Sequence, residues 1–308
     1  MSAARGADRR THGRDGTATT HPCSPLPPRR RRSRRTSTAR RQVMWRSLPL
    51  ALLLVGAGGC RTPEPPEAAA PVEDSAPAPP PREPDIGVET FAGRRFTVCR
   101  VDLTRQELEL FWKDDQGRPF GGFAALEAWL RGRSRRLVFA TNAGMYMEDL
   151  TPVGLYVERG KQLRPLNRSR GDGSNFCLLP NGAFALTTSG AKVVESSRYE
   201  AIRDQTQLAT QSGPMLVIEG ELHPKFGRNS TSRLIRNGIG VPSPQEVVLA
   251  LAEDPVNFHE FATFFRDGLG CDNALYLDGA ISGLYAPALD RNDSHAPFGP
   301  MLAVVAPL

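Results

Sequence analysis

A short apolar run that ends in an acidic residue is the feature that most constrains how this chain can fold. The run from Ala274 to Leu277 is followed directly by Asp278 and Gly279. Its composition predicts a buried strand, and a carboxylate at the end of a buried strand is unfavourable unless it is paired or used in chemistry. Gly279 lets the chain turn sharply and lets a ligand approach the backbone. The stretch therefore indicates either an ordinary Asp-Gly turn or a strand that presents an acid to a site.

The positive charge of the chain is confined to its N-terminal part. The formal net charge is +6, but residues 1–59 carry 13 Arg and 2 acidic residues, whereas residues 60–308 carry 26 Lys or Arg and 31 Asp or Glu. The basic run at 29–35 has no interleaved aromatic residues and precedes a hydrophobic segment, which argues against nucleic-acid binding. We therefore expect no nucleic-acid partner.

A lipoprotein signal peptide is predicted at 44–59, within a basic and otherwise disordered extension at 1–59. A short positive segment at Met44 precedes an apolar run of about ten residues, which is too short to span a bilayer. The run ends in small residues directly before Cys60. This pattern resembles the lipobox of bacterial lipoproteins. The resemblance implies that Cys60 carries a lipid that anchors the protein in the cell envelope, at the outer membrane or periplasmic face. A separate hypothesis is that translation begins at Met44.

The rest of the chain divides into a tether and a folded domain. Residues 60–85 are rich in Pro, Ala and Glu, a composition that predicts an extended tether. The domain is expected at 86–308, which is long enough to bury a sizeable core. Short strands joined by hairpins, with two helices among them, predict an α+β fold: a single domain of mixed, largely antiparallel sheets with helices packed against them.

Local patterns predict the following elements. Apolar residues at helical spacing indicate a helix over 121–131, and a second, Phe-rich helix is expected to begin at an Asp254 cap and to end at Gly268. Strands at 96–102 and 107–112 are expected to pair with each other, and a strand at 176–179 is expected to begin a hairpin.

Two polar segments lie next to predicted strands in the first half of the domain. Asn142 and Gly144 follow an apolar strand, and the Asn142 amide offers two donors and an acceptor. Ser212 and Gly213 directly precede a strand that begins at Met215. Each segment fits a functional loop, but each also fits an ordinary turn.

A third polar segment combines an arginine with small residues. Arg236 is followed by Asn237 and Gly238, so a guanidinium is placed beside open backbone, and arginine is the side chain suited to bind a phosphate through two hydrogen bonds. A solvated arginine in a turn is the alternative interpretation. The histidines of the domain are too far apart to show zinc-ligand spacing: His223, His259 and His295.

Taken together, these segments resemble the phosphodiester glycosidase family, whose animal member removes N-acetylglucosamine from mannose-6-phosphate precursors. The resemblance lies in the order and spacing of four segments: Asn142–Gly144, Gln211–Pro214, Arg236–Gly240 and Leu277–Gly279. It covers roughly residues 95–307 and includes the stretches at 257–261 and 298–301. One difference is that the family often has Asp-Gly-Gly-Gly-Ser where this chain has Asp278 followed by Gly-Ala-Ile-Ser, so we expect a narrower or differently shaped pocket.

The resemblance implies an enzyme that hydrolyses a sugar-phosphodiester bond on the sugar side, in glycans of the envelope or outside the cell. It implies that Asp278 is the nucleophile or general base, that Arg236 binds the phosphate, and that Asn142 takes part in catalysis. The further residues expected to bind the substrate are Gly144, Ser212, Gly213, Asn237, Gly238, Gly279 and Ser282. No metal ligands are predicted and no cofactor is certain, although a divalent cation is left open.

Two alternatives belong to other functional classes. The first is a lipid-anchored protein that binds polysaccharide without turning it over. The second is a serine hydrolase that acts through Ser212, but the chain has no Gly-x-Ser-x-Gly elbow and the sequence shows no histidine partnered with this serine.

Overall fold

The computed structural model describes residues 83–308 except 172 and 294. The predicted signal peptide, Cys60 and almost all of the predicted tether lie outside the described residues. The described part consists mostly of antiparallel sheets with a few short helices, so the predicted α+β class is confirmed. None of the helices in this part is long and apolar enough to cross a membrane.

The first sheet carries the predicted acidic-ended strand. Its seven antiparallel strands lie in the order β1-β2-β13-β12-β14-β10-β11. They are β1 (Asp85–Phe91), β2 (Arg94–Asp102), β10 (Met215–Ile218), β11 (Glu221–Leu222), β12 (Asn237–Ser243), β13 (Glu246–Ala252) and β14 (Ala274–Asp278). Every residue of β14 is buried, and Asp278 lies opposite Asn237 of β12. The predicted buried strand is therefore confirmed.

The second sheet has five strands in the order β16-β15-β4-β17-β3. They are β3 (Glu107–Phe111), β4 (Arg135–Asn142), β15 (Leu284–Ala286), β16 (Arg291–Asn292) and β17 (Met301–Pro307), with the short 3-10 helix η5 (Pro287–Leu289) between β15 and β16. Helix α1 (Phe123–Arg131) is formed where it was predicted, and its buried residues pack in a cluster with residues of β4 and β17.

The predicted pairing of strands 96–102 and 107–112 is wrong. β2 pairs with β1 and β13 in the first sheet, while β3 pairs with β17 in the second. Four residues connect the two strands, but β2 already has a partner on each side. The chain therefore passes from one sheet to the next at this point, a choice that the local alternation of residues does not encode.

The third sheet has the order β6-β5-β9-β7-β8. Its strands are β5 (Tyr156–Glu158), β6 (Lys161–Arg164), β7 (Gly182–Thr187), β8 (Gly190–Glu195) and β9 (Thr206–Ser212), and the 3-10 helices η2 (Ser196–Ala201) and η3 (Arg203–Gln205) connect β8 to β9. The strand predicted at 176–179 is wrong, because this segment forms a 3-10 helix, η1 (Asn175–Cys177). Its apolar residues are buried in a small cluster with Val153; a short apolar run does not by itself distinguish a strand from a packed turn.

Helix α2 (Phe258–Thr263) continues into one turn of π-helix, η4 (Phe264–Gly268). The predicted end at Gly268 is confirmed, but the predicted cap is wrong. Asn257 is the cap: its side chain accepts a hydrogen bond from the Glu260 backbone N–H, and the Glu260 carboxylate accepts one from the Asn257 N–H, which is a reciprocal capping box. Asp254 instead accepts hydrogen bonds from the backbone and side chain of Arg95.

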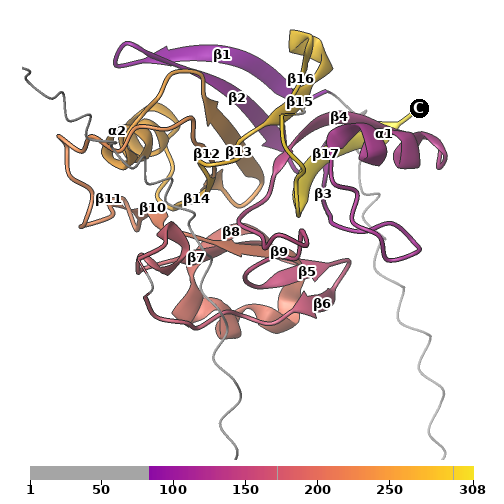
Figure 1. Cartoon of the computed structure of the whole chain (residues 1–308), viewed down its shortest axis with the longest axis horizontal. Coiled ribbons are helices and arrows are strands. Elements are labelled where there is room, and N and C mark those ends of the chain that lie inside the picture. The colour runs from indigo at the N-terminus through magenta and orange to yellow at the C-terminus, as the bar shows by residue number, and fades with distance from the viewer. Residues whose placement is uncertain (1–82, 172, 294) are drawn as a thin grey trace, which may run out of the picture. The chain divides into compact units, whose positions relative to one another are not determined.

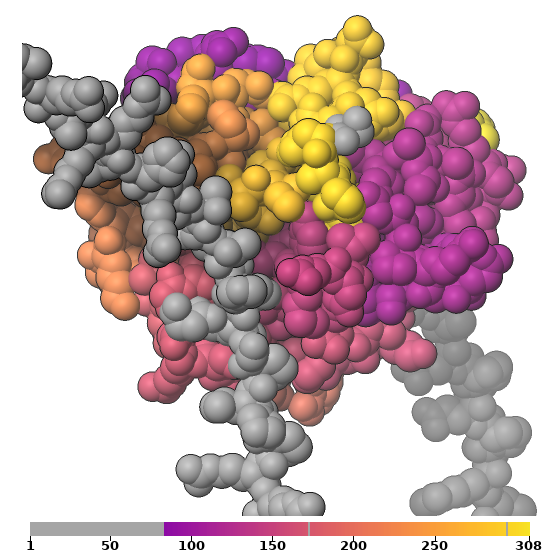
Figure 2. Space-filling model, viewed as in Figure 1, coloured from indigo at the N-terminus to yellow at the C-terminus, as the bar shows by residue number. Residues whose placement is uncertain are grey.

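One hydrophobic core is shared by all three sheets. It contains Leu277 and Ile239 of the first sheet, Leu302 of the second and Phe184 of the third. Helix α2 covers the other face of the first sheet with a separate aromatic cluster. Figure 1 shows the three sheets around this common centre, with α1 and α2 outside it. In Figure 2 the yellow C-terminal segment lies beside magenta segments, which are far from it in sequence.

Candidate active site

Asp278 is held at the end of β14 by the turn that follows it. One carboxylate oxygen, Oδ1, accepts hydrogen bonds from the backbone N–H groups of Gly279, Ala280 and Ile281 at 2.6, 3.0 and 3.5 Å. Burial raises the pKa of Asp278 to about 6, although these three N–H groups act in the opposite direction. No described residue donates a hydrogen bond to Oδ2, and the residue is 8% exposed. One oxygen is thus anchored and the other is available for chemistry.

Asn237 connects Asp278 to Asn142. Its Oδ1 accepts a hydrogen bond from the Asp278 backbone N–H at 2.9 Å, and its Nδ2 donates to both the side-chain and the backbone oxygen of Asn142, at 3.0 and 2.9 Å. Nδ2 also donates to the hydroxyl of Thr141 at 2.8 Å. Because Asn237 is at the start of β12, it ties the end of β4 to the end of β14. The structure thus brings together two predicted site residues that are 136 positions apart.

Asn142 has a buried donor without a partner among the described residues. Its Oδ1 accepts hydrogen bonds from Asn237 Nδ2 and from the Gly283 N–H at 3.2 Å. Both partners are donors, so the amide orientation is set and Nδ2 must face the other way. Asn142 Nδ2 is buried with no hydrogen-bond partner, which is unfavourable by about 1–3 kcal/mol. A ligand oxygen at this point would satisfy it.

Arg236 approaches the same turn from the α2 side of the sheet, and it is completely buried. Its Nε donates to the Val256 carbonyl at 3.0 Å, and Nη1 donates to the Tyr276 hydroxyl at 3.3 Å. Its guanidinium carbon lies 3.8 Å from the centre of the Phe258 ring. No carboxylate among the described residues forms an ion pair with it, and burial lowers the pKa of Arg236. The structure therefore places a buried positive charge beside the Gly279 turn, and its guanidinium nitrogens already donate to protein oxygens.

The absence of a side chain at Gly279 lets Tyr276 and Arg236 pack against the turn after Asp278. A Cβ at this position would lie 2.2 Å from the Tyr276 hydroxyl oxygen and 3.4 Å from Arg236 Nη1. Such a contact with the end of a buried ring is not tolerated without a shift of the backbone. Glycine is therefore required here by the packing of Tyr276, in addition to the turn.

The segment around Ser212 packs against the strand that ends at Asp278 and has a structural role. Ser212 is fully buried, and its hydroxyl donates to the Leu277 carbonyl at 2.8 Å. Gly144 packs against Ser212, with a φ of +128° that disfavours other residues. A Cβ on Gly213 would lie 2.6 Å from Asn181 Cβ, so packing accounts for this glycine. In the described part of the chain no histidine bonds to the Ser212 hydroxyl, so no base for the serine-hydrolase alternative is found there.

Two further residues that were predicted to bind the substrate, Gly238 and Ser282, make contacts within the protein. A Cβ on Gly238 would meet ring atoms of Phe261 and Phe265 at 3.1 Å, so this residue faces the aromatic cluster under α2. Ser282 donates to the Asp278 carbonyl at 3.0 Å and closes the turn after the acid.

Two tyrosines at the site were missed from the sequence. Tyr276 was assigned only to an apolar strand, and Tyr146 only to a loop. Burial and the nearby Asp278 carboxylate raise the pKa of both phenols. The Tyr146 hydroxyl donates to the Pro297 carbonyl at 2.6 Å and so joins the loop after β4 to the loop before β17. The alternation of residues in β14 puts Tyr276 on the same side as Asp278, and this was the signal available in the sequence.

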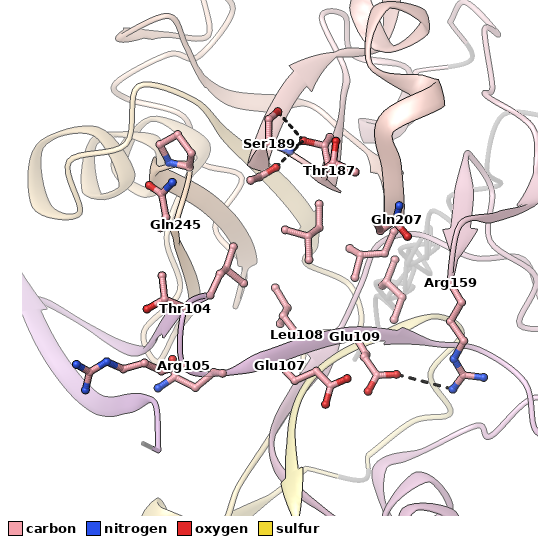
Figure 3. A pocket seen from close by; sticks show the side chains of 18 of the residues that line it. Thr104, Arg105, Glu107, Leu108, Glu109, Arg159, Thr187, Ser189, Gln207 and Gln245 are labelled. Carbon is pink, nitrogen blue, oxygen red and sulfur yellow. Dashed lines mark hydrogen bonds and ion pairs between the residues drawn. The ribbon is translucent and has the colours of Figure 1, made fainter. Parts of the chain in front are cut away.

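A large cavity lies elsewhere in the fold. Its volume is about 1080 Å³, and it is lined by residues of β3 and by the turns between β5 and β6, β7 and β8, and β12 and β13. Figure 3 shows Leu108 pointing into it and the ion pair between Glu109 and Arg159 at one side. Pro244 and Gln245 line it from the end of β12 opposite to Asn237, about 20 Å away along the strand. This cavity is therefore separate from the Asp278 site.

The described residues contain no group of three or more His, Cys, Asp or Glu side chains arranged to hold a metal ion. The candidate site thus consists of one carboxylate, one buried guanidinium, two amides and two phenols. This set can bind oxygen-rich groups and can supply an attacking carboxylate.

Comparisons with known proteins find chains that are similar to this one. Escherichia coli (strain K12) YigE, an uncharacterised protein, is 32% identical over 204 residues, which cover 66% of this chain and 79% of YigE. The catalytic domain of zebrafish N-acetylglucosamine-1-phosphodiester alpha-N-acetylglucosaminidase, auto-inhibited by its pro-peptide, has a TM-score of 0.48 at 14% identity and covers 72% of this chain and 82% of that chain. A hypothetical protein from Synechocystis has a TM-score of 0.45 at 13% identity, with 72% and 62% covered.

The phosphodiester glycosidase family model matches residues 135–304. The match begins at the first residue of β4, later than the start near 95 expected from the sequence, and leaves out β1 to β3. It contains Asn142, Arg236, Asn237 and Asp278. The chain therefore belongs to the phosphodiester glycosidase family.

Proposed function

We propose that this protein hydrolyses a sugar-phosphodiester bond on the sugar side, with Asp278 as the nucleophile or general base. Family membership supports a hydrolase that acts on sugar phosphodiesters. The observation that carries the assignment is the geometry of Asp278, whose Oδ1 is anchored by backbone N–H groups while Oδ2 has no donor among the described residues. Glycans of the envelope or the cell exterior are the proposed source of substrate.

The chemistry requires little from the protein beyond a positioned carboxylate. In one form, Asp278 Oδ2 attacks the anomeric carbon while the bond from that carbon to the phosphate oxygen breaks, and the phosphomonoester leaves with the electron pair. Water then hydrolyses the glycosyl ester. In the other form, Asp278 takes a proton from the water that attacks the same carbon. A phosphomonoester is a good leaving group, so a strong general acid is not needed.

The other groups act by charge and hydrogen bonding. The unpartnered Asn142 Nδ2 donates to a sugar or phosphate oxygen, which satisfies a buried donor that is otherwise unpaired. Arg236 supplies positive potential on the side of the departing phosphate. Its guanidinium nitrogens already donate to protein oxygens, so we assign it this potential and no contact with the substrate.

A hydrolysis assay tests the proposal. The purified protein is incubated with a panel of nitrophenyl phosphodiesters of sugar 1-phosphates, and release of the nitrophenyl phosphate ester is measured. We expect turnover by the wild type and none by Asp278→Asn. Because the ionised carboxylate is required and its pKa is about 6, kcat/KM should fall as the pH decreases below about 6. Retained activity in Asp278→Asn would contradict the role of Asp278, and binding of the panel without turnover would favour the polysaccharide-binding alternative.

The predicted lipid anchor belongs to the same proposal. Only the sequence at 44–60 supports it, because these residues lie outside the described part. The intact mass of the membrane-extracted protein tests it, with a lipidated Cys60 at the N-terminus as the expected result. A different N-terminus disproves the anchor without affecting the assignment of Asp278.

A further inference from the structure

Arg236 is the largest of the fully buried side chains among the described residues, and its guanidinium is occupied on several sides. Nε donates to the Val256 carbonyl, and Nη2 donates to the Ser232 carbonyl at 3.1 Å. Phe258 covers one face of the guanidinium. The remaining terminal nitrogen, Nη1, donates to the Tyr276 hydroxyl. Each guanidinium nitrogen thus already has an acceptor within the protein.

The Tyr276 hydroxyl fills the space between Arg236 and the turn after Asp278. The position of a Cβ on Gly279 lies only 2.2 Å from this hydroxyl oxygen, so the phenol is packed directly against the turn. The Gly279 N–H in turn donates to Asp278 Oδ1 at 2.6 Å. A continuous series of contacts thus runs from the guanidinium through the phenol and the turn to the carboxylate.

We propose that Arg236 acts through Tyr276: the guanidinium holds the Tyr276 hydroxyl against the Gly279 turn, and the turn holds the Asp278 carboxylate in its reacting orientation. This inference rests on the proposed function and deepens it. Both Arg236 and Tyr276 are positioning residues, and neither binds the phosphate. Tyr276 is fully buried like Arg236, which agrees with a role behind the reacting atoms.

The local chemistry explains why a tyrosine is needed at this position. A phenylalanine would keep the edge contact that Tyr276 makes with Phe258, whose ring centre is 4.8 Å away. It would remove the acceptor of Arg236 Nη1 and leave a buried charged donor unpaired. Loss of the hydroxyl would also open a gap beside Gly279, so the turn would hold the carboxylate less firmly.

The test compares Tyr276→Phe, Arg236→Lys and the double variant in the phosphodiester assay. Loss of a hydrogen bond to a charged group predicts that Tyr276→Phe lowers kcat by about tenfold or more. Arg236→Lys should lower kcat similarly. The kcat of the double variant should be no lower than that of the less active single variant, because both changes break the same series of contacts. KM and the inhibition constant of inorganic phosphate should stay within about twofold of wild type, because neither residue contacts the substrate in this proposal.

Tyr156→Phe is the matched control. Tyr156 is also fully buried, and its hydroxyl donates to the Glu158 carboxylate at 3.0 Å in the third sheet. Tyr156→Phe also deletes a buried phenol hydroxyl, but one that is not at the Asp278 site, so kcat should not change. A fall in kcat equal to that of Tyr276→Phe would show that the effect is general loss of stability, and it would overturn the inference.

Two further results would also overturn it. One is a Tyr276→Phe variant with the wild-type kcat. The other is an Arg236→Lys variant in which inorganic phosphate inhibits about tenfold more weakly, since that is the result expected of a direct phosphate ligand. If the wild type turns over no member of the panel, the proposed function fails separately. Calorimetric titration with inorganic phosphate then decides the inference: an enclosed guanidinium predicts that Arg236→Lys behaves like wild type, and weaker binding in the variant overturns it.

Discussion

Replacement of Asp278 by asparagine should make the folded protein more stable at neutral pH. The pKa of Asp278 is raised by burial to about 6, roughly two units above the value of about 3.9 in an unfolded chain. Each unit corresponds to about 1.4 kcal/mol. Ionising this carboxyl in the folded state therefore destabilises the protein by up to about 3 kcal/mol.

The direction of the pH dependence follows from where the proton binds more tightly. The folded chain holds the Asp278 proton more tightly than the unfolded chain does, so this group lowers stability as the pH rises from about 4 to about 6, and the loss persists above that range. Asparagine does not ionise, and its oxygen can accept the same hydrogen bonds from Gly279 and Ala280. The stability of the variant relative to wild type should therefore increase by up to about 3 kcal/mol between pH 4 and pH 7.5.

Urea unfolding at a series of pH values measures this difference. At each pH the free energy of unfolding of the wild type is subtracted from that of the variant. Only the change of this difference with pH is interpreted, because an effect of the substitution that does not depend on ionisation is the same at every pH. Asp204→Asn is the control for the loss of an exposed carboxylate, because its side chain is 89% exposed, and the change with pH for Asp278→Asn should exceed the change for this control. In the same preparation, Asp278→Asn should lose turnover by at least about 10³-fold. A stability difference for Asp278→Asn that does not vary with pH would refute the reasoning.

Three other substitutions test the packing of the site. Gly279→Ala should destabilise the protein by about 1–3 kcal/mol, and adding Tyr276→Phe should recover part of the loss in urea unfolding; no recovery would mean that the phenol hydroxyl is not the obstacle. Gly240→Ala places a Cβ 2.5 Å from Cys271 Sγ, so calorimetry should show a lower Tm. A change in the kcat of the folded protein would count against a purely structural role of Gly240. Asn237→Ala should lower both stability, by about 2–4 kcal/mol, and kcat; an unaffected kcat would show that the link between the two strand ends is dispensable.

Much of the local structure could be predicted from the sequence. The acidic-ended strand at 274–278, the helix at 121–131 and the helix end at Gly268 depend on short-range patterns of apolar residues and glycine, which are visible in a few consecutive residues. The prediction that Asn142 and Asp278 lie close together came instead from a family resemblance, because no local pattern connects them.

Other features were decided only by the tertiary structure. The partners of β2 and β3 depend on strands far away in the sequence, so their separation into two sheets had no local signal. Asn237 lies within a segment that local patterns left open between a turn and a functional loop, and the structure makes it the first residue of a central strand.

The same distinction applies to the site. Residue types and a strand end were enough to select Asp278, because a carboxylate after a buried apolar run is costly wherever the strand packs. They were not enough to show that Arg236 is enclosed, that Tyr276 separates it from the turn, or that one amide nitrogen of Asn142 is left without a partner. Those facts depend on which side chains meet where β4 and β14 end and β12 begins, and only the packing of distant segments determines that.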